Sequence, residues 1–328
     1  MANEFEIVRY PKIKNLNIFI VEMEYRTLHI HRDFELNLIL DGHMTIFSNS
    51  KRYSVSTGDL LLFNPNQPHE LFAQGEICVK ILCLQISPRF FRDTLPAMQD
   101  VSFQMVKLRN NEIGNWIKSF SRNFVKLALT YIEEPHPYYQ LLCASRINEI
   151  FYLLLEHIPV RFPSPMDRKA IERKAERILR LLDFVDSNFM YKINLGDFAQ
   201  AEGLSLNHLS YFIKENINQT FQEYVTNIRY NHACKLLLSG DKRLIDICFE
   251  SGFSDPRYLT KAFLKKTGMR PDEYRHKFAA VKPEEQYQRN RYSSQKFYSD
   301  AKAKQILSNY CIEEAKTINF RKKLEIVN

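Results

Sequence analysis

Two stretches in the C-terminal half of the chain share one pattern about fifty residues apart, and each predicts a helix, a tight turn and a second helix. The first covers residues 195–213 and the second covers residues 244–263. Gly203 and Gly252 stand at the predicted turns, where a residue without Cβ can adopt positive φ. An internal repeat indicates that one structural unit is used twice. Because a helix-turn-helix presents its second helix to the DNA major groove, the repeat predicts two DNA-reading helices in one chain.

The second helix of each unit is predicted to pack through an apolar face and to meet DNA through a polar face. Ser205 and Ser254 precede these helices as predicted N-caps. The apolar faces comprise Leu209, Phe212 and Ile213 in the first unit and Leu259, Ala262 and Phe263 in the second. The candidate DNA-binding residues are Asn207, His208, Tyr211 and Lys214 in the first unit and Arg257, Thr260, Lys261 and Lys265 in the second. Asn and Arg can make paired bonds to adenine and guanine edges, whereas Lys and Tyr more often contact phosphate.

A helix predicted at residues 220–238 joins the two units. At about 1.5 Å per residue this helix would span roughly 28 Å. Successive major grooves on one face of B-DNA lie about 34 Å apart. One chain could therefore place its two reading helices in consecutive grooves of double-stranded DNA.

The excess positive charge of the chain is confined to the half that carries the repeat. Lys and Arg number 17 against 17 Asp and Glu in residues 1–166, 19 against 15 in residues 167–278, and 10 against 6 in residues 279–328. Lys and Arg supply non-specific DNA affinity by releasing counterions from phosphates. This distribution favours a nucleic-acid partner for the C-terminal half.

The first hundred residues predict short β-strands between turn signals, which is the pattern of an antiparallel sandwich or barrel. The predicted strands are residues 17–24, 34–40, 44–48, 59–63 and 77–86. Apolar residues three and four positions apart then predict two helices, at residues 111–131 and 138–158. We expect both helices to pack against the strands.

Residues 159–165 contain three prolines and cannot continue a helix, so they are the predicted linker between two domains. Asp167 is the predicted N-cap of the helical half. The fold class is therefore α+β, with a β-barrel followed by an all-α domain. The predicted domains are residues 1–160 and 167–278, with a basic tail at 279–328 in which residues 299–317 could form a helix.

Three motifs in the helical half are specific enough to indicate a family. They are Ser254-Asp-Pro-Arg-Tyr-Leu-Thr-Lys-Ala-Phe263, Thr267-Gly-Met-Arg-Pro-Asp-Glu-Tyr-Arg275, and Tyr224-Val-Thr-Asn-Ile-Arg229 with Ala233 and Leu236-Leu237. With them, residues 167–278 resemble the C-terminal domain of the AraC/XylS family of bacterial transcription regulators. The first unit departs from the family at Ile213, where the family prefers Phe, and at Asn218, where it prefers Gly.

The N-terminal half carries a histidine-rich pattern. It reads His29-Ile-His-Arg-Asp-Phe-Glu35, followed by Gly42, Gly58-Asp, Pro65 and His69. This pattern resembles the two sequence motifs of cupin β-barrels, which many AraC/XylS regulators carry as an effector-binding domain.

The resemblance implies two alternative roles for His29, His31, Glu35 and His69. In enzymatic cupins these positions bind a metal ion, and three imidazoles with a carboxylate suit iron, manganese or a similar divalent ion. Regulatory cupins commonly keep the pattern without a metal, and the second motif here lacks the usual glycine. We therefore expect no metal and no cofactor, and interpret the four side chains as effector-binding groups that orient an organic ligand in a mostly apolar cavity.

The resemblance implies a sequence-specific transcription regulator, with activation favoured, that responds to a small molecule bound in the barrel. The expected partners are double-stranded DNA, a small-molecule effector, a second copy of the chain in a homodimer, and RNA polymerase if the protein activates transcription. The alternatives are a cupin metalloenzyme fused to a DNA-binding domain and a regulator without a ligand. The sequence contains no nucleophile–base pair or phosphate loop, so we expect no enzymatic activity.

The sequence also predicts a cytoplasmic protein that does not enter the membrane. Its first residues are acidic, unlike a secretory signal, and no run approaches the roughly 18 apolar residues of a membrane-spanning helix. The six cysteines are scattered and lack paired CxxC spacing, so we expect reduced thiols and no structural zinc.

Overall fold

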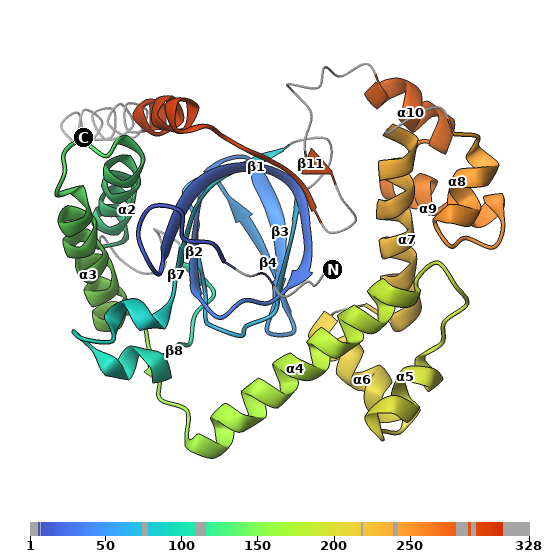
Figure 1. Cartoon of the computed structure of the whole chain (residues 1–328), viewed down its shortest axis with the longest axis horizontal. Helices are drawn as coiled ribbons and strands as arrows, with labels where there is room; N and C mark the ends of the chain where they lie inside the picture. The colour runs from blue at the N-terminus through green and yellow to red at the C-terminus, as the bar shows by residue number, and fades with distance from the viewer. Residues whose placement is uncertain are drawn as a thin grey trace, which may run out of the picture.

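The chain forms a β-barrel flanked by helices, and a separate group of helices lies beside it (Figure 1). The computed structural model describes residues 6, 8–73, 78–108, 116–217, 219–238, 242–279, 288–289 and 293–310. No helix in these ranges is long and apolar enough to cross a membrane.

The barrel is a single antiparallel sheet whose strand order is β4-β3-β6-β1-β7-β2-β5-β9. Its strands are β1 Leu16–His29, β2 Phe34–Asp41, β3 His43–Ser48, β4 Lys51–Ser56, β5 Leu60–Phe63, β6 His69–Ala73, β7 Val79–Ile86 and β9 Lys107–Leu108. The five predicted strands all form. The sequence did not predict β4, which is largely polar, or β6, which is short. The first strand extends five residues beyond its prediction and ends at His29.

Strand β2 shows how the period-two pattern separates the two faces of the sheet. Leu36 and Leu38 point outward, while Glu35 and Asn37 between them point into the barrel. Every one of these side chains is buried, Glu35 and Asn37 inside the barrel and the two leucines beneath helices.

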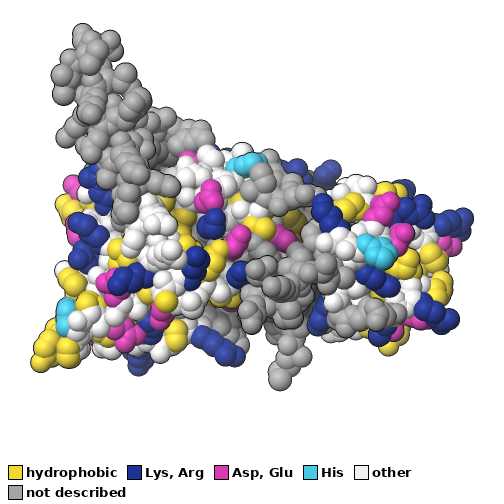
Figure 2. Space-filling view, turned by 90° about the horizontal axis from the view of Figure 1, so that it is seen from above, with side chains coloured by type: hydrophobic (Ala, Val, Ile, Leu, Met, Phe, Trp, Pro, Cys, Tyr) yellow, Lys and Arg dark blue, Asp and Glu magenta, His cyan; other side chains and the backbone are white. Residues whose placement is uncertain are grey.

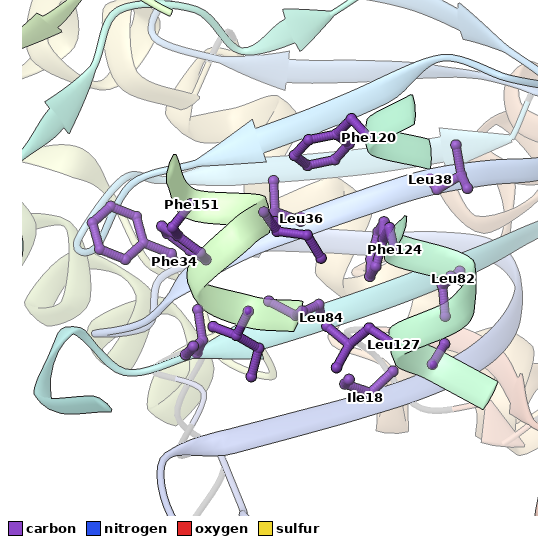
Figure 3. Packing of buried hydrophobic residues seen from close by; sticks show 14 of the residues in the cluster. Ile18, Phe34, Leu36, Leu38, Leu82, Leu84, Phe120, Phe124, Leu127 and Phe151 are labelled. Atoms are coloured by element: carbon purple, nitrogen blue, oxygen red, sulfur yellow. The ribbon is translucent and has the colours of Figure 1, made fainter. Parts of the chain in front are cut away.

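Helices α2 (Trp116–Glu133) and α3 (Tyr139–His157) supply that cover, as expected from the sequence. Figure 3 shows Phe120, Phe124 and Leu127 of α2 facing the leucines of β2 and β7. The predicted first helix included residues 111–115, which lie outside the described residues.

Two short 3-10 helices and a two-stranded sheet lead toward the helical region. The elements are η1 Pro88–Phe91, η2 Pro96–Asp100, β8 Ser102–Phe103 and β10 Val160–Arg161, and β10 pairs with β8. Helix α4 (Pro165–Asn188) then begins three residues earlier than an N-cap at Asp167 would place it. Its N-cap is Ser164, and Asp167 is instead the third helical residue of a capping box with Ser164. The prediction of Asp167 as the N-cap was wrong because Pro165 is accepted at the first helical position.

Six further helices form the two repeated units. They are α5 Leu195–Glu202, α6 Leu206–Ile217, α7 Phe221–Leu238, α8 Leu244–Glu250, α9 Pro256–Thr267 and α10 Pro271–Ala279. Helix α7 is shared, since Val225 and Ile228 belong to the apolar core of the first unit while Ala233 and Leu237 belong to that of the second.

The described part of the tail returns to the barrel. Strands β11 (Gln288–Arg289) and β12 (Ser293–Phe297) pair with each other, and β12 adds to β1 with Phe297 opposite Val21. Residues 300–310 are helical and bury Ala303 and Leu307 in the cluster that includes α2 and α3. Residues 311–317 of the predicted tail helix lie outside the described residues. The five described cysteines are free thiols, while Cys311 is outside the described ranges.

Candidate DNA-binding surface and effector site

Both predicted turns contain a glycine in the left-handed region, with φ of 63° at Gly203 and 78° at Gly252. The two positions differ in their surroundings. A Cβ at Gly203 would meet open space, whereas a Cβ at Gly252 would lie 2.4 Å from the carbonyl oxygen of Phe189. That carbonyl also accepts a hydrogen bond of 2.7 Å from the Arg229 guanidinium of α7. The second turn is therefore locked against the end of α4.

The caps of the two reading helices also differ. The Ser205 hydroxyl accepts from the backbone N–H of His208 at 3.3 Å, as the sequence predicted for α6. Helix α9 is capped by Asp255, whose carboxylate accepts from the backbone N–H of Arg257 at 2.7 Å. The prediction of Ser254 as the cap was wrong by one residue, because Asp255 immediately precedes the proline at the first helical position.

The predicted division of each reading helix into a packed face and a free face agrees with the burial pattern. All six apolar residues assigned to the packed faces are buried: Leu209, Phe212, Ile213, Leu259, Ala262 and Phe263. The eight candidate DNA-binding residues lie on the other faces: Asn207, His208, Tyr211, Lys214, Arg257, Lys261 and Lys265 are exposed, and Thr260 is half-buried. Lys and Arg side chains gather at the end of the molecule that α8 to α10 form (Figure 2).

Arg257 is paired with its own cap. Its Nε and Nη2 atoms lie 3.0 and 2.9 Å from the two carboxylate oxygens of Asp255, while its side chain is 88% exposed. An exposed ion pair contributes only about 0–1 kcal/mol. Arg257 can therefore exchange this carboxylate for a base edge at little cost.

Lysines from the two reading helices lie on the same side of α7. Thr220 lowers the pKa of Glu223 by hydrogen bonding, and the positive charges of Lys265 and Lys214 lower it further. Arg270 also lines a shallow surface hollow with Lys261 and Lys265. Arg270, between α9 and α10, stands in the motif Thr267–Arg275 but was not a candidate DNA-binding residue, because the candidates were taken from the second helix of each unit.

The four candidate effector residues come together inside the barrel. His29 ends β1, His31 follows it, Glu35 lies on β2 and His69 begins β6 directly opposite His29. All four are buried, and one candidate ligand atom from each lies within 4.8 Å of the others. We call this set the His3Glu cluster.

Hydrogen bonds to the backbone orient all three imidazoles of the His3Glu cluster. Each Nδ1 lies 2.9–3.0 Å from a carbonyl oxygen, which belongs to Thr27, Asp33 or Gln67. A carbonyl can only accept, so each Nδ1 carries the proton and donates it. The Nε2 atoms then face the cluster interior, where those of His31 and His69 lie beside Glu35.

The Glu35 carboxylate is the anionic centre of the cluster. Its oxygens lie 3.0 Å from His31 Nε2 and 3.5 Å from His69 Nε2, and they accept from the amides of Asn37 at 2.6 Å and Gln85 at 3.0 Å. Among the described residues, the buried Nε2 of His69 makes no hydrogen bond, and the Glu35 carboxylate at 3.5 Å is its polar neighbour.

These contacts give the cluster members opposite protonation behaviour. Burial acts to raise the pKa of Glu35, but the imidazoles of His31 and His69 hold it well below its usual range. Burial acts to lower the pKa of His31, yet its contact with Glu35 raises it to about 8. Burial and the charge of His69 lower the pKa of His29. A positive charge is therefore favoured between the nitrogens and Glu35, and the donor set fits a divalent transition-metal ion as well as a proton.

The space beside the cluster is small. A cavity of about 70 Å³ is lined by Phe19, Glu35, Cys83 and Phe297 among others. Pockets for organic ligands typically measure about 300–1,000 Å³. In the described part of the barrel, the cavity beside the His3Glu cluster does not have the volume that the sequence led us to expect for an organic effector.

A larger cleft of about 720 Å³ lies between the barrel and the helical units. Strands β3, β4 and β6 form one wall, and helices α7 and α9 form the other. The wall residues include Phe47, Arg52, Glu70 and Phe72 from the barrel, and Tyr230, Tyr258, Lys261, Lys265 and Lys266 from the helices. The Lys266 ammonium lies 5.5 Å from the centre of the Phe72 ring. Part of the predicted DNA-reading face of α9 therefore faces the barrel.

Strand alternation connects the His3Glu cluster to both helix-turn-helix units. Leu28 and Ile30, which flank His29, are fully buried in the same apolar cluster as the residues of α4, α6 and α7 that form the first unit. Glu70, which follows His69, is buried facing Lys266 of the second unit, and burial raises its pKa to about 7 while Lys266 opposes that rise. Consecutive residues thus contact the cluster on one side and a DNA-reading unit on the other.

Two parts of the chain match protein-family models. Residues 21–151 match an AraC-like ligand-binding domain, and residues 198–277 match a helix-turn-helix domain. The melibiose operon regulatory protein of Escherichia coli (strain K12) is 25% identical over 273 residues, covering 78% of this chain and 87% of that protein. The lactose operon transcription activator of Staphylococcus xylosus is 30% identical over 139 residues, covering 42% and 48%. The structure of unsaturated fatty acid bound ToxT from Vibrio cholerae covers 83% of this chain and 99% of that chain, at 13% identity and a TM-score of 0.40.

Proposed function

Since the chain belongs to the AraC family of transcription regulators, we propose that ligand binding at the His3Glu cluster controls how its two helix-turn-helix units hold DNA. The protein is an effector-responsive DNA-binding regulator. Its reading helices are α6 and α9, and the eight exposed or half-buried polar residues assigned above supply the contacts to bases and phosphates.

The observation that carries this proposal is the alternation of residues along β1 and β6. A ligand that draws His29, His31 and His69 toward Glu35 must shift the strand segments that hold them. The same segments contact the first unit through Leu28 and Ile30 and the second unit through Glu70. Ligand binding would therefore favour one arrangement of barrel and helices over another.

The arrangement described here is one in which the second unit is docked on the barrel. Tyr258, Lys261 and Lys265 of α9 line the cleft opposite Phe72. A cleft with the volume of a small organic molecule cannot admit a DNA duplex. DNA binding by the whole of α9 therefore requires the second unit to move away from the barrel.

The expected homodimer is part of the proposal, and helix α3 supplies an exposed apolar face for it. On the outer face of α3, Leu141 and Tyr152 lie three turns apart and are 73% and 60% exposed. These two apolar side chains support dimerisation through α3.

We also propose that the protein activates transcription through RNA polymerase and that it is located in the cytoplasm. The relative from Staphylococcus xylosus is named a transcription activator, which supports activation here. The metalloenzyme alternative has no support beyond the four side chains of the cluster, since the relatives reported above are named as regulators.

Selection of bound fragments from a random DNA pool tests the function directly. The purified full chain should enrich two short sequence blocks about one helical turn apart, because each reading helix enters one major groove. The matched control is the chain with Arg257→Ala and Asn207→Ala together, which should enrich neither block. Binding of all sequences alike by the unmodified chain would contradict the proposal.

A further inference from the structure

We propose that residues 293–310 form an autoinhibitory strap, which docks on the free edge of β1, holds the second helix-turn-helix unit beside the barrel and thereby weakens DNA binding. The strap lies beyond residue 277, where the match to the helix-turn-helix family model ends. Its attachment to the barrel is argued from its own contacts. Its effect on DNA binding rests on the proposed function above.

Strand β12 of the strap occupies an edge of β1 that the other described strands of the barrel leave unpaired. Val21 and Met23 pair with both β7 and β12. Tyr25 and Arg26 pair with both β6 and β12. Because a strand has only two edges, β6 and β7 together take one edge and β12 takes the other. A free strand edge readily pairs with an added strand, so this edge of β1 is a docking surface and the strap is its partner.

Side chains reinforce the pairing of the strap with β1. The Tyr298 hydroxyl donates to Glu22, and the Ser294 hydroxyl donates to Glu24. Burial and the contact with Glu22 raise the pKa of Tyr298, so this hydroxyl keeps its proton and remains a donor. Ser293 and Ser294 are almost fully buried. The strand is therefore fixed by specific side-chain contacts as well as by its backbone.

The helical part of the strap anchors it on the side of the barrel that α2 covers. Figure 1 shows the strap in red, crossing the barrel from the side of the second unit to the side of α2. Ala303 and Leu307 are buried in the apolar cluster that includes α2 and α3, and Lys304 pairs with Glu133 of α2 at 3.0 Å. Exposed ion pairs contribute little, whereas a fully buried leucine contributes strongly. Leu307 is therefore the main anchor of the helix.

The strap is connected directly to the second unit. Helix α10 ends at Ala279, and strand β11, which pairs with β12, begins nine residues later at Gln288. Nine fully extended residues span at most about 32 Å. On its other side the second unit shares α7 with the first unit, whose core includes the barrel residue Leu28. A docked strap thus holds the second unit from both sides and limits how far it can leave the barrel.

This restraint has a direct consequence for DNA binding. Lys261 and Lys265 of the second reading helix line the cleft that faces the barrel. Molecules in which the second unit stays beside the barrel do not offer the whole of this helix to DNA. The apparent affinity for DNA is lowered by the fraction of molecules that are competent to bind, and release of the strap raises that fraction.

Leu307→Asp in the full-length chain tests the strap, because a carboxylate is strongly disfavoured in the apolar cluster that buries Leu307. The substitution is placed in the helix because Gln295 and Phe297 of β12 also line the cavity beside the His3Glu cluster. The matched control is Asn309→Asp, which adds the same charge at an exposed position of the same helix.

Hydrogen exchange measures docking of the strap, and fluorescence anisotropy measures affinity for the selected DNA. In Leu307→Asp, exchange should increase in residues 21–26 of β1 and in β12. Its affinity for the selected DNA should rise about 10-fold, the order expected for the loss of one buried leucine. Asn309→Asp should match the unmodified chain in both measurements. Unchanged exchange in Leu307→Asp would overturn the anchor, and increased exchange with unchanged or weaker DNA binding would overturn the restraint.

A disulfide gives the opposite test, and it keeps the proposal testable if Leu307→Asp fails to fold. Glu22 and Lys296 are direct partners on β1 and β12, on the face away from the cavity. Opposite residues of antiparallel strands have Cα atoms about 4.5–5.5 Å apart, which a disulfide can bridge. Glu22→Cys combined with Lys296→Cys should bind the selected DNA at least several-fold more weakly when oxidised than after reduction.

Lys296→Cys alone is the control for oxidation, and its affinity should not respond to reduction. Equal affinity of the double variant in both states, with the bond verified by mass spectrometry, would overturn the restraint. DNA selection by the unmodified chain separates this inference from the proposed function. Failure to enrich any sequence would refute the proposed function, while hydrogen exchange would still decide whether the strap docks. Enrichment without any gain in Leu307→Asp would refute only the autoinhibitory role.

Discussion

The two helix-turn-helix units have similar internal structure but are attached to the barrel in different ways. The first unit shares a continuous apolar core with the end of β1, since Leu28 and Ile30 are buried among its helices. Among the described residues, the core of the second unit contains no barrel side chain. It meets the barrel across a cleft, where Lys266 lies over Phe72 and faces Glu70.

This difference indicates which unit can move. Separating the first unit would expose apolar surface at a cost of about 25 cal/mol for each Å². Separating the second unit breaks polar and cation–aromatic contacts that water can replace. The second unit can therefore leave the barrel at a lower free-energy cost, while the first unit stays attached to it.

Leu28→Ala should give the largest effect, because it removes one of the two buried side chains, Leu28 and Ile30, that attach the first unit to the barrel. A buried leucine replaced by alanine costs about 2–5 kcal/mol in the free energy of unfolding. Urea unfolding of the full chain measures this loss, and hydrogen exchange locates it. Exchange should rise in α4 and α6 as well as in β1.

Ile46→Ala is the matched control for that prediction. Ile46 is fully buried on β3, in a barrel cluster whose described members include no residue of the helical units. Its loss should destabilise the barrel while the exchange of α4 and α6 stays the same. An equal response of those helices in both variants would show that β1 does not anchor the first unit.

Gly252→Ala should destabilise the second unit more than Gly203→Ala destabilises the first. Each substitution places a side chain at positive φ, which costs about 1–2 kcal/mol. Only at Gly252 would the new Cβ also meet backbone, 2.4 Å from the Phe189 carbonyl oxygen. We expect about 1 kcal/mol at Gly203 and about 2–4 kcal/mol at Gly252, measured by urea unfolding. Equal losses would mean that the contact between the second turn and α4 relaxes freely.

The repeat made the helical half predictable from local sequence. Turn glycines, apolar spacing and capping residues act within a few positions of one another, so they indicated the reading helices and their packed faces. The errors were local too: Ser164 makes the cap in place of Asp167, and Asp255 makes it in place of Ser254, each directly before a proline at the first helical position. Arg270 was not predicted as a DNA-binding residue, because its position on the surface depends on how α10 packs.

The barrel was less predictable because its site depends on pairing across distant strands. The sequence indicated that His29, His31, Glu35 and His69 belong together, and the pairing of β1 with β6 brings them within reach. It could not indicate how much volume the surrounding side chains would leave. Phe297, more than two hundred residues away from His69, lines that space from a strand that local patterns did not predict.

Arg257→Ala should weaken binding to the selected DNA by about 1–3 kcal/mol, if Arg257 contacts a base. Asn207→Ala, at a corresponding place on α6, should have a smaller effect, because a neutral amide makes weaker hydrogen bonds than a guanidinium. Competition against random DNA at fixed salt distinguishes base reading from phosphate contact. Equal losses for selected and random DNA would assign Arg257 to phosphate, and a larger loss for Asn207→Ala would make the first unit the principal reader.

Phe72→Ala should give the smallest effect, and it tests directly whether docking on the barrel restrains the second unit. It removes the ring beneath Lys266 without changing any candidate DNA-binding residue. A cation over an aromatic ring contributes about 0.5–1 kcal/mol at an exposed site, so undocking should become about 2- to 5-fold easier. The variant should then bind the selected DNA about 2- to 5-fold more tightly, as measured by fluorescence anisotropy. Because the substitution lies on the barrel, tighter binding can only arise through the position of the second unit, and unchanged or weaker binding would contradict the docked arrangement as the restraint.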